Sequence, residues 1–173
     1  MEEPKFVINT SMTKEDYKRF LYIATFRKNK YTIPILGLIS FVGSVIIAFN
    51  SGNFSFIGFI VGWPLLFGLT IMVIMFKIER KNTQRIKTDK TGTFDSIYIL
   101  EFYDDKILME NDFLKSKGQI MYNQFYFLME SKEYFIFYLT GNQASLIRKK
   151  DINNLAEFKE FILGKFKGKY KMI

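Results

Sequence analysis

The feature that most constrains the fold is an uninterrupted uncharged segment in the first half of the chain. Residues 31–76 contain no Asp, Glu, Lys, Arg or His. Helices and strands of soluble domains usually keep one polar face toward water, so an uncharged segment of this length is unusual there. A membrane-spanning helix needs about 20 apolar residues to cross about 30 Å of hydrocarbon. The segment therefore predicts a two-helix transmembrane hairpin with spans at about 33–49 and 56–76.

A short polar stretch, NSGN at residues 50–53, separates the two predicted spans. Asn and Gly tolerate left-handed backbone conformations, and Ser and Asn side chains can bond nearby backbone groups. The stretch therefore predicts a tight turn at the tip of the hairpin. The alternative is a surface turn in a helical hairpin that is buried inside a soluble bundle.

Small residues recur at four-residue spacing in both predicted spans. The first span carries Ser40, Ser44 and Ala48, and the second carries Gly58 and Gly62. Small residues let helix backbones approach closely in lipid. We expect Ser44 to pack near Gly62 and Ala48 near Gly58. The alternative is that these residues form the interface of a homodimer through the hairpin.

Basic residues flank the uncharged segment on both sides, whereas the predicted turn has none. Because cytoplasmic loops are rich in Lys and Arg, we expect a two-pass plasma-membrane protein with both termini in the cytoplasm. The flanks carry the whole net charge of +8, which contact with the anionic inner leaflet explains more simply than a nucleic-acid partner does. The basic residues expected at the membrane interface are Arg27, Lys28, Lys30, Lys77, Arg80, Lys81, Lys165, Lys167, Lys169 and Lys171.

Periodicity predicts the elements on either side of the hairpin. In the first block, residues 1–30, KFVIN at 5–9 predicts a strand. An amphipathic helix follows from Thr13, and it packs on its own domain or lies on the membrane surface. Residues 77–90 form a basic juxtamembrane helix or linker.

The last block, residues 91–173, has a period of two and is rich in Ile, Tyr and Phe. It predicts an antiparallel β-meander. The strand segments are 93–103, 106–112, 118–130, 133–140 and 144–150. A helix from about Asn154 closes the chain, and its apolar side comprises Leu155, Phe158, Ile162 and Phe166. The final KFKGKYK at 165–171 is either a solvated, frayed end or a polybasic patch that touches anionic lipid.

The sequence lacks the residues of most catalytic sites. The chain contains no Cys and no His, which excludes disulfides, thiolate chemistry and zinc sites with histidine ligands. The acidic pairs Asp104–Asp105 and Glu110–Asp112 lie at a predicted turn and a predicted strand end, where solvated carboxylates are common. No G-x-x-x-x-G-K-[ST] phosphate loop is present. We therefore expect no enzymatic activity, no cofactor and no metal.

The segment YNQFYFLMESKEYFIFYLTGNQASLIRKKDI, residues 122–152, carries a resemblance. Its pattern is a Tyr, an apolar residue three positions on, a Glu, a YF-x-x-YL strand, and a small residue before a final strand. This pattern is similar to that of the YcxB-like family of bacterial membrane proteins, in which the final strand resembles IIPK. Here the final strand reads SLIRKK, with Arg148 where the family often has Pro.

The resemblance implies a membrane α+β fold. In it, residues 91–173 form a pleckstrin-homology-like (PH-like) antiparallel sheet capped by the C-terminal helix, on the cytoplasmic side of the hairpin. It implies no activity, because none is established for the family. Two functions remain. The first is a membrane-anchored, non-enzymatic interaction module that binds a protein or a lipid headgroup at the inner face of the bacterial membrane. The second is a self-immunity protein against a bacteriocin or other membrane-active toxin.

Overall fold

The chain divides into two compact units. The computed structural model describes residues 3–50, 53–90, 92–94, 96–111, 113 and 115–173. The sheet unit comprises Met1–Lys14 and Asp89–Ile173, and the helical unit comprises Glu15–Thr88. The expected N-terminal block 1–30 is therefore divided, because its strand belongs with the C-terminal sheets and its helix belongs with the hairpin.

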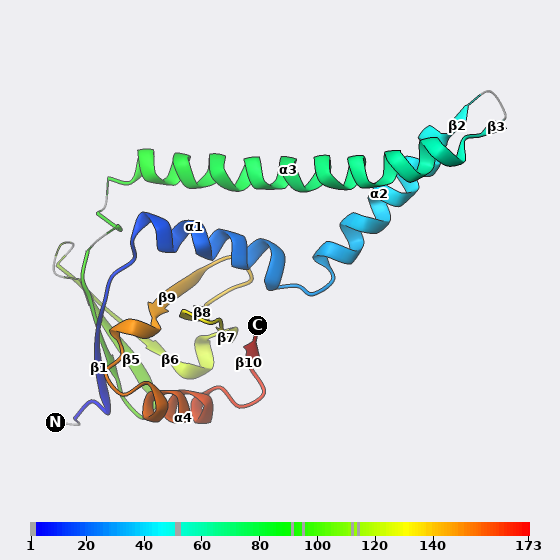
Figure 1. The fold of residues 1–173 in the computed structure, drawn as a ribbon. Coiled ribbons are helices and arrows are strands. Elements are labelled where there is room, and N and C mark those ends of the chain that lie inside the picture. The colour runs from blue at the N-terminus through cyan, green and yellow to red at the C-terminus, as the bar shows by residue number, and fades with distance from the viewer. Residues whose placement is uncertain (1–2, 51–52, 91, 95, 112, 114) are drawn as a thin grey trace. The chain divides into compact units, whose positions relative to one another are not determined.

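The helical unit consists of two long helices preceded by a short one (Figure 1). Its elements are α1 (Lys14–Tyr22), the π-helical turn η1 (Ile23–Arg27), α2 (Thr32–Ala48) and α3 (Phe56–Thr88). The short strands β2 (Phe49–Asn50) and β3 (Asn53–Phe54) pair antiparallel between α2 and α3. They flank the predicted turn, of which residues 51 and 52 lie outside the described residues.

By length and composition, α3 can cross a membrane. The segments Lys14–Arg27 and Thr32–Ala48 pass the same test only when they are taken together. The chain bends by 63° between them, so together they would form one broken span. Alone, α2 has 17 residues, which span about 26 Å at 1.5 Å per residue. The described chain thus holds one candidate span, or two if the bent pair is counted as one. Residues 77–88, predicted as a helix or linker, continue α3 without a break.

Small side chains lie in the contact between α2 and α3, where the Phe41 ring also contacts the rings of Phe59 and Trp63. The buried residues of α2 are Ser40, Ser44 and Ala48, the predicted small-residue series. A Cβ atom placed on Gly62 would lie 3.8 Å from the Cβ of Ser44, so the structure brings these two positions together. A Cβ placed on Gly58 would instead meet Ser55, at 3.0 Å from its Oγ, and Ala48 is not among its near neighbours.

Polar contacts tie α1 to α3. The Tyr22 hydroxyl donates a hydrogen bond to Oε1 of Glu79 at 2.9 Å, and Lys18 Nζ lies 2.9 Å from the same oxygen. The hydrogen bond from Lys18 holds the pKa of Glu79 below its usual range. Because Leu21 is also buried, α1 packs on its own protein, the first of the two alternatives for this helix.

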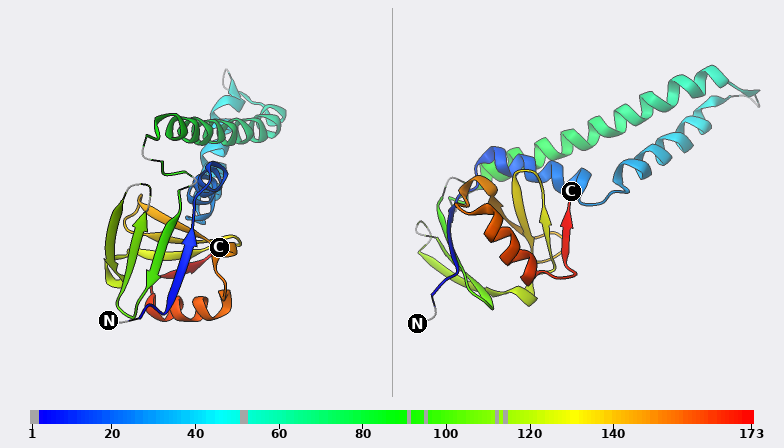
Figure 2. Two further views of the ribbon diagram at one scale, coloured as in Figure 1. Left: turned by 90° about the vertical axis from the view of Figure 1, so that its left-hand side faces the viewer. Right: turned by 60° about the horizontal axis from the view of Figure 1, so that its bottom comes forward.

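The sheet unit contains two four-stranded sheets (Figure 2). The first has the order β1-β4-β5-β6, with β1 (Phe6–Thr10), β4 (Tyr98–Phe102), β5 (Lys106–Asn111) and β6 (Ser116–Met121). The second has the order β10-β7-β8-β9, with β7 (Phe127–Glu130), β8 (Tyr134–Tyr138), β9 (Ala144–Arg148) and β10 (Tyr170–Met172). All neighbouring strands are antiparallel except β10 and β7, which are parallel.

The prediction of a single antiparallel meander was therefore wrong. The predicted strand 118–130 is interrupted by the 3-10 turn η2 (Tyr122–Gln124), after which the chain enters the second sheet. The Gln124 side chain accepts a hydrogen bond from the backbone N–H of Met121, and Tyr122 and Phe125 are both buried. Tyr122 and Phe125 are therefore buried at the corner where the chain passes from the first sheet to the second. The C-terminal tail, predicted as frayed or lipid-bound, forms β10.

Helix α4 (Leu155–Lys165) packs against both sheets through aromatic rings. Phe158 lies 4.9 Å from Phe102 of the first sheet and 5.6 Å from Phe135 of the second, measured between ring centroids. Phe166, just after the helix, lies 5.7 Å from Phe137. Of the predicted apolar side, Phe158, Ile162 and Phe166 are buried, whereas Leu155 in the first turn is exposed.

The α2–α3 contact predicts a position-dependent effect of enlarging a glycine. Gly62→Leu should lower the thermal stability of the full chain in detergent by about 1–3 kcal/mol, because its side chain would be forced against Ser44. Gly68→Leu is the matched control in the same helix, since nothing lies within 4 Å of a Cβ atom placed there. Equal effects of the two substitutions on the unfolding temperature would contradict the contact.

Candidate functional site

A cavity of about 480 Å³ lies between the two sheets. Alternate residues of the first sheet face this interior in three rows set by the strand register. Starting from the end that contacts α4, the rows are Phe6–Phe102–Ile107–Ile120, Ile8–Leu100–Met109–Gly118 and Thr10–Tyr98–Asn111–Ser116. The facing wall is formed by Phe125, which follows η2, and by residues of β8 and β9, among them Phe137, Ser145 and Ile147.

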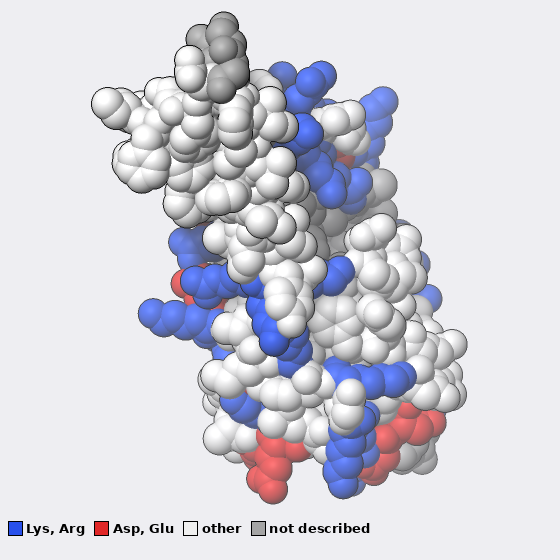
Figure 3. All heavy atoms as spheres, turned by 90° about the vertical axis from the view of Figure 1, so that its right-hand side faces the viewer, with Lys and Arg blue, Asp and Glu red and all other residues white. Residues whose placement is uncertain are grey.

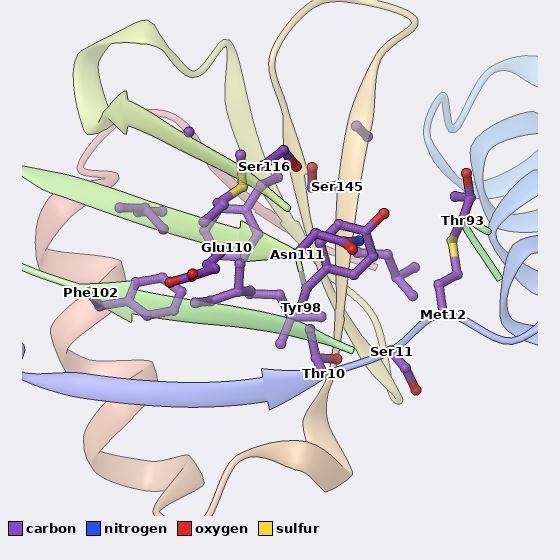
Figure 4. Close-up of a pocket in the computed structure, with 18 of the residues that line it drawn as sticks. Thr10, Ser11, Met12, Thr93, Tyr98, Phe102, Glu110, Asn111, Ser116 and Ser145 are labelled. Atoms are coloured by element: carbon purple, nitrogen blue, oxygen red, sulfur yellow. The ribbon is translucent and has the colours of Figure 1, made fainter. Parts of the chain in front are cut away.

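The chemistry of the three rows changes from one end of the cavity to the other. The first row is large and apolar, and its Phe102 contacts Phe158 of α4, which closes this end. The second row lacks a side chain at Gly118. The third row carries hydroxyl and amide groups and no charge. Figure 4 shows Phe102 at one end and Tyr98, Asn111, Ser116 and Ser145 toward the other. The cavity therefore has an aromatic floor, apolar walls and a polar mouth, and the paired side chains of Glu110 and Lys117 also contribute to its lining.

An ion pair joins the end of β1 to the turn after β9 beside the mouth. Arg148 Nε lies 2.7 Å from Oδ2 of Asp151, and both side chains are largely buried. The Thr10 hydroxyl donates to the same oxygen at 2.6 Å, and Arg148 Nη2 donates to the Ser11 hydroxyl at 2.9 Å. These bonds satisfy the buried charges and fix β1 of the first sheet against β9 of the second.

A second polar cluster surrounds the buried carboxylate of Glu130, which is 2 % exposed. It accepts hydrogen bonds from Lys149 Nζ and from the Tyr170 hydroxyl, and Lys159 Nζ lies 2.9 Å from its Oε2. Burial would raise the pKa of Glu130, but the hydrogen bonds from Lys149, Tyr170 and Lys159 outweigh it and hold this pKa below its usual range. Burial, followed by the bond to Glu130, raises the pKa of Tyr170 to about 12. The cluster links β7, β10, α4 and the residue after β9.

The basic residues predicted near the membrane fall into two groups. In the helical unit, five of the six are exposed and Lys28 is half-buried. They comprise Arg27, Lys28 and Lys30 before α2 and Lys77, Arg80 and Lys81 on α3. Lys30 Nζ lies 5.1 Å from the ring centroid of Tyr31. These residues bracket the uncharged part of the hairpin.

The predicted C-terminal basic residues are partly used within the sheet unit. Lys165 Nζ lies 3.0 Å from Oδ1 of Asp104, and this bond holds the pKa of Asp104 below its usual range. Lys169 Nζ donates to the backbone carbonyls of Asn123 and Phe125 at 3.3 and 3.1 Å. Lys167 is exposed, and Lys171 lies within β10. The tail is thus anchored to the sheet unit.

The acidic residues form no metal centre that the structure shows. Among the described residues, no group of three or more Asp and Glu side chains is placed to hold a metal ion. Glu110 pairs with Lys117 at 2.8 Å on the outer face of the first sheet. Asp112, the other member of its predicted acidic pair, lies outside the described residues.

The cavity is the candidate site that sequence reasoning missed. Its signal is present in the chain as Gly118 within a strand and as the adjacent small residues Ala144 and Ser145. A Gly inside a strand often marks a close approach or an unfilled space. The facing positions become apparent only with the strand register, which pairs Gly118 with Met109 and Ser145 with Phe137.

The Glu130 cluster predicts a stability difference that depends on pH. Glu130→Gln should lower the free energy of unfolding by about 2 kcal/mol at neutral pH, because Lys149 and Lys159 would lose their carboxylate. The folded-state pKa of Glu130 is depressed. Its stabilising contribution is therefore full above the unfolded pKa, near 4.3, and is lost as the pH falls through the folded value. The difference between parent and variant should shrink below about pH 4.

Urea denaturation of the full chain in detergent, followed by tyrosine fluorescence, measures this difference. The control is Glu110→Gln, whose ion pair with Lys117 is exposed and should contribute less than about 1 kcal/mol. A Glu130 variant that is no less stable than this control at pH 7 would contradict the role of the cluster.

Comparison with known proteins identifies a family for part of the sheet unit. The family described as YcxB-like protein matches residues 102–162, which run from the end of β4 into α4. No curated protein and no solved structure matches the chain. The pattern residues Tyr122, Phe125, Glu130 and Phe135 all lie within this range and are buried. The predicted resemblance to the YcxB-like family is therefore confirmed over residues 102–162, the part of the chain that the family matches.

Proposed function

We propose that the chain is a membrane-anchored, non-enzymatic interaction module. In this proposal α2 and α3 span the bacterial plasma membrane as a hairpin and hold the sheet unit at the inner face. There the sheet unit binds a protein or a lipid ligand.

The observation that carries the proposal is the outer surface of the hairpin. The side chains buried in α2 are small, whereas large apolar side chains around both helices are exposed. Figure 3 shows surface without charge at the α2–α3 end of the helical unit. The most exposed of these side chains include Leu38, Ile46, Ile47, Phe56, Ile57, Leu65, Met72 and Phe76. Exposed apolar surface of this extent is unfavourable in water and is typical of contact with lipid or protein.

Three further features favour lipid over a protein partner for this surface. No charged residue occurs from 31 to 76, and basic side chains are exposed on either side of this segment. The Ser44–Gly62 contact is made within one chain, so it does not require a second copy. Lys and Arg residues on both flanks favour an orientation with both termini in the cytoplasm and the hairpin tip outside.

Cysteine labelling tests the anchoring and the orientation. The chain has no native cysteine, so Asn53→Cys at the tip and Lys132→Cys in the sheet unit each provide a unique thiol. Both positions are exposed. An impermeant maleimide added to intact bacterial cells should label position 53 and should label position 132 only after the cells are opened.

Two results would overturn parts of the proposal. Labelling of position 132 in intact cells would contradict the proposed cytoplasmic location of the sheet unit. Recovery of the untagged chain in the soluble fraction, with neither position labelled in intact cells, would contradict the proposal that α2 and α3 span the membrane.

A further inference from the structure

We propose that the cavity between the two sheets binds a single-chain amphiphile of the fatty-acid class, with the acyl chain inside and the polar end at the mouth. The inference concerns the sheet unit alone and goes beyond anchoring by the hairpin. It names a ligand class for a site made by residues that face the interior.

The dimensions of the cavity suit a small elongated ligand. Its volume of about 480 Å³ lies within the range of roughly 300–1,000 Å³ that is typical of ligand sites. The wall of β4 runs from Tyr98 at the mouth to Phe102 at the floor, which corresponds to about 14 Å along a strand.

The lining requires a ligand that is apolar along most of its length. Leu100, Phe102, Ile107, Met109 and Phe137 form the floor and walls, and none of them carries a hydrogen-bonding side chain. A polar ligand would lose its bonds to water there without replacement. An acyl chain loses none and gains from the removal of its surface from water.

The mouth requires one polar end that accepts hydrogen bonds. Tyr98, Asn111 and Ser116 occupy one row of the first sheet, and Ser145 faces them from the second. Ser116 and Ser145 are solvent-exposed, so a carboxyl group at this level would receive hydroxyl donors and remain hydrated. The nearby Arg148 is bound to Asp151 and Ser11. The charged lining residues Glu110 and Lys117 pair with each other at 2.8 Å, so the lining carries no net charge.

The cavity depends on small residues at its rim, and these define the test. A side chain at Gly118 would point inward, because this position pairs with Met109 on the cavity side of the sheet. Its neighbour Gln119 pairs with Leu108 and faces outward. Gly118→Trp should therefore fill the cavity just inside the mouth, whereas Gln119→Trp adds the same side chain to the outer face of the same strand.

The probe is palmitic acid with a photoreactive diazirine on its chain, applied to the full chain in lipid nanodiscs. After illumination, mass spectrometry of peptides should find the label on β4, β5 or β9 as well as on α2 and α3. Gly118→Trp should reduce labelling of the sheet-unit peptides by about tenfold or more, equivalent to about 1.4 kcal/mol of binding. Labelling of α2 and α3 should stay unchanged, and Gln119→Trp should label like the parent.

Two further variants guard against a folding artefact. A Cβ atom at position 118 would lie 4.0 Å from Cε of Met109, an ordinary contact, so Gly118→Ala should retain labelling. Ser145→Trp narrows the mouth from the opposite wall and should reduce labelling as Gly118→Trp does, with unfolding temperatures within a few degrees of the parent.

Each result decides one proposal. Absence of label from β4, β5 and β9 in the parent, or full labelling in both Gly118→Trp and Ser145→Trp, would overturn the fatty-acid site. Label on the sheet unit without label on α2 and α3 would support the site and contradict the membrane hairpin.

Discussion

The sheet unit depends on a cluster of aromatic rings that closes only one end of its two sheets. Phe158 contacts Phe102 and Phe135, one from each sheet, and Phe166 contacts Phe137. Rings of this size bury much surface and prefer the edge-to-face geometry that these pairs show. At the opposite end, Gly118 and Ser145 provide little side-chain volume. Large rings therefore fill the α4 end of the sheet unit, whereas the other end leaves space for the cavity.

The two units follow opposite rules for the placement of large apolar side chains. In the sheet unit, Phe102, Phe135 and Phe158 have almost no exposed surface, whereas in the helical unit Ile46 and Ile57 are more than two-thirds exposed. Burial of small residues such as Ser44 between helices gives little hydrophobic gain in water, but it permits close backbone packing when the surroundings are as apolar as the side chains. One chain thus combines a sheet unit with a large buried aromatic core and a helical hairpin whose large apolar side chains face outward.

Periodicity in the sequence predicted most elements but could not predict how they assemble. Three features could be predicted because each depends on spacing within one element. They are the uncharged segment, the small residues that face inward in α2, and the buried side of α4. The corner at Tyr122–Gln124 could not be predicted, since residues 118–130 are as rich in Ile, Met, Tyr and Phe as one continuous strand would be. Parallel pairing of β10 with β7 and the cavity both depend on contacts between distant segments, which no local pattern encodes.

The family pattern explains the fold of this region more than its ligand. Tyr122 donates its hydroxyl hydrogen to the carbonyl of Tyr103 at the corner, and Glu130 holds four elements together through buried hydrogen bonds. Both roles are structural. Thr10 and Tyr98, in the row at the mouth of the cavity, lie outside the matched range 102–162. Asn111 and Ser116 of the same row lie inside that range, so the family match includes only part of the mouth.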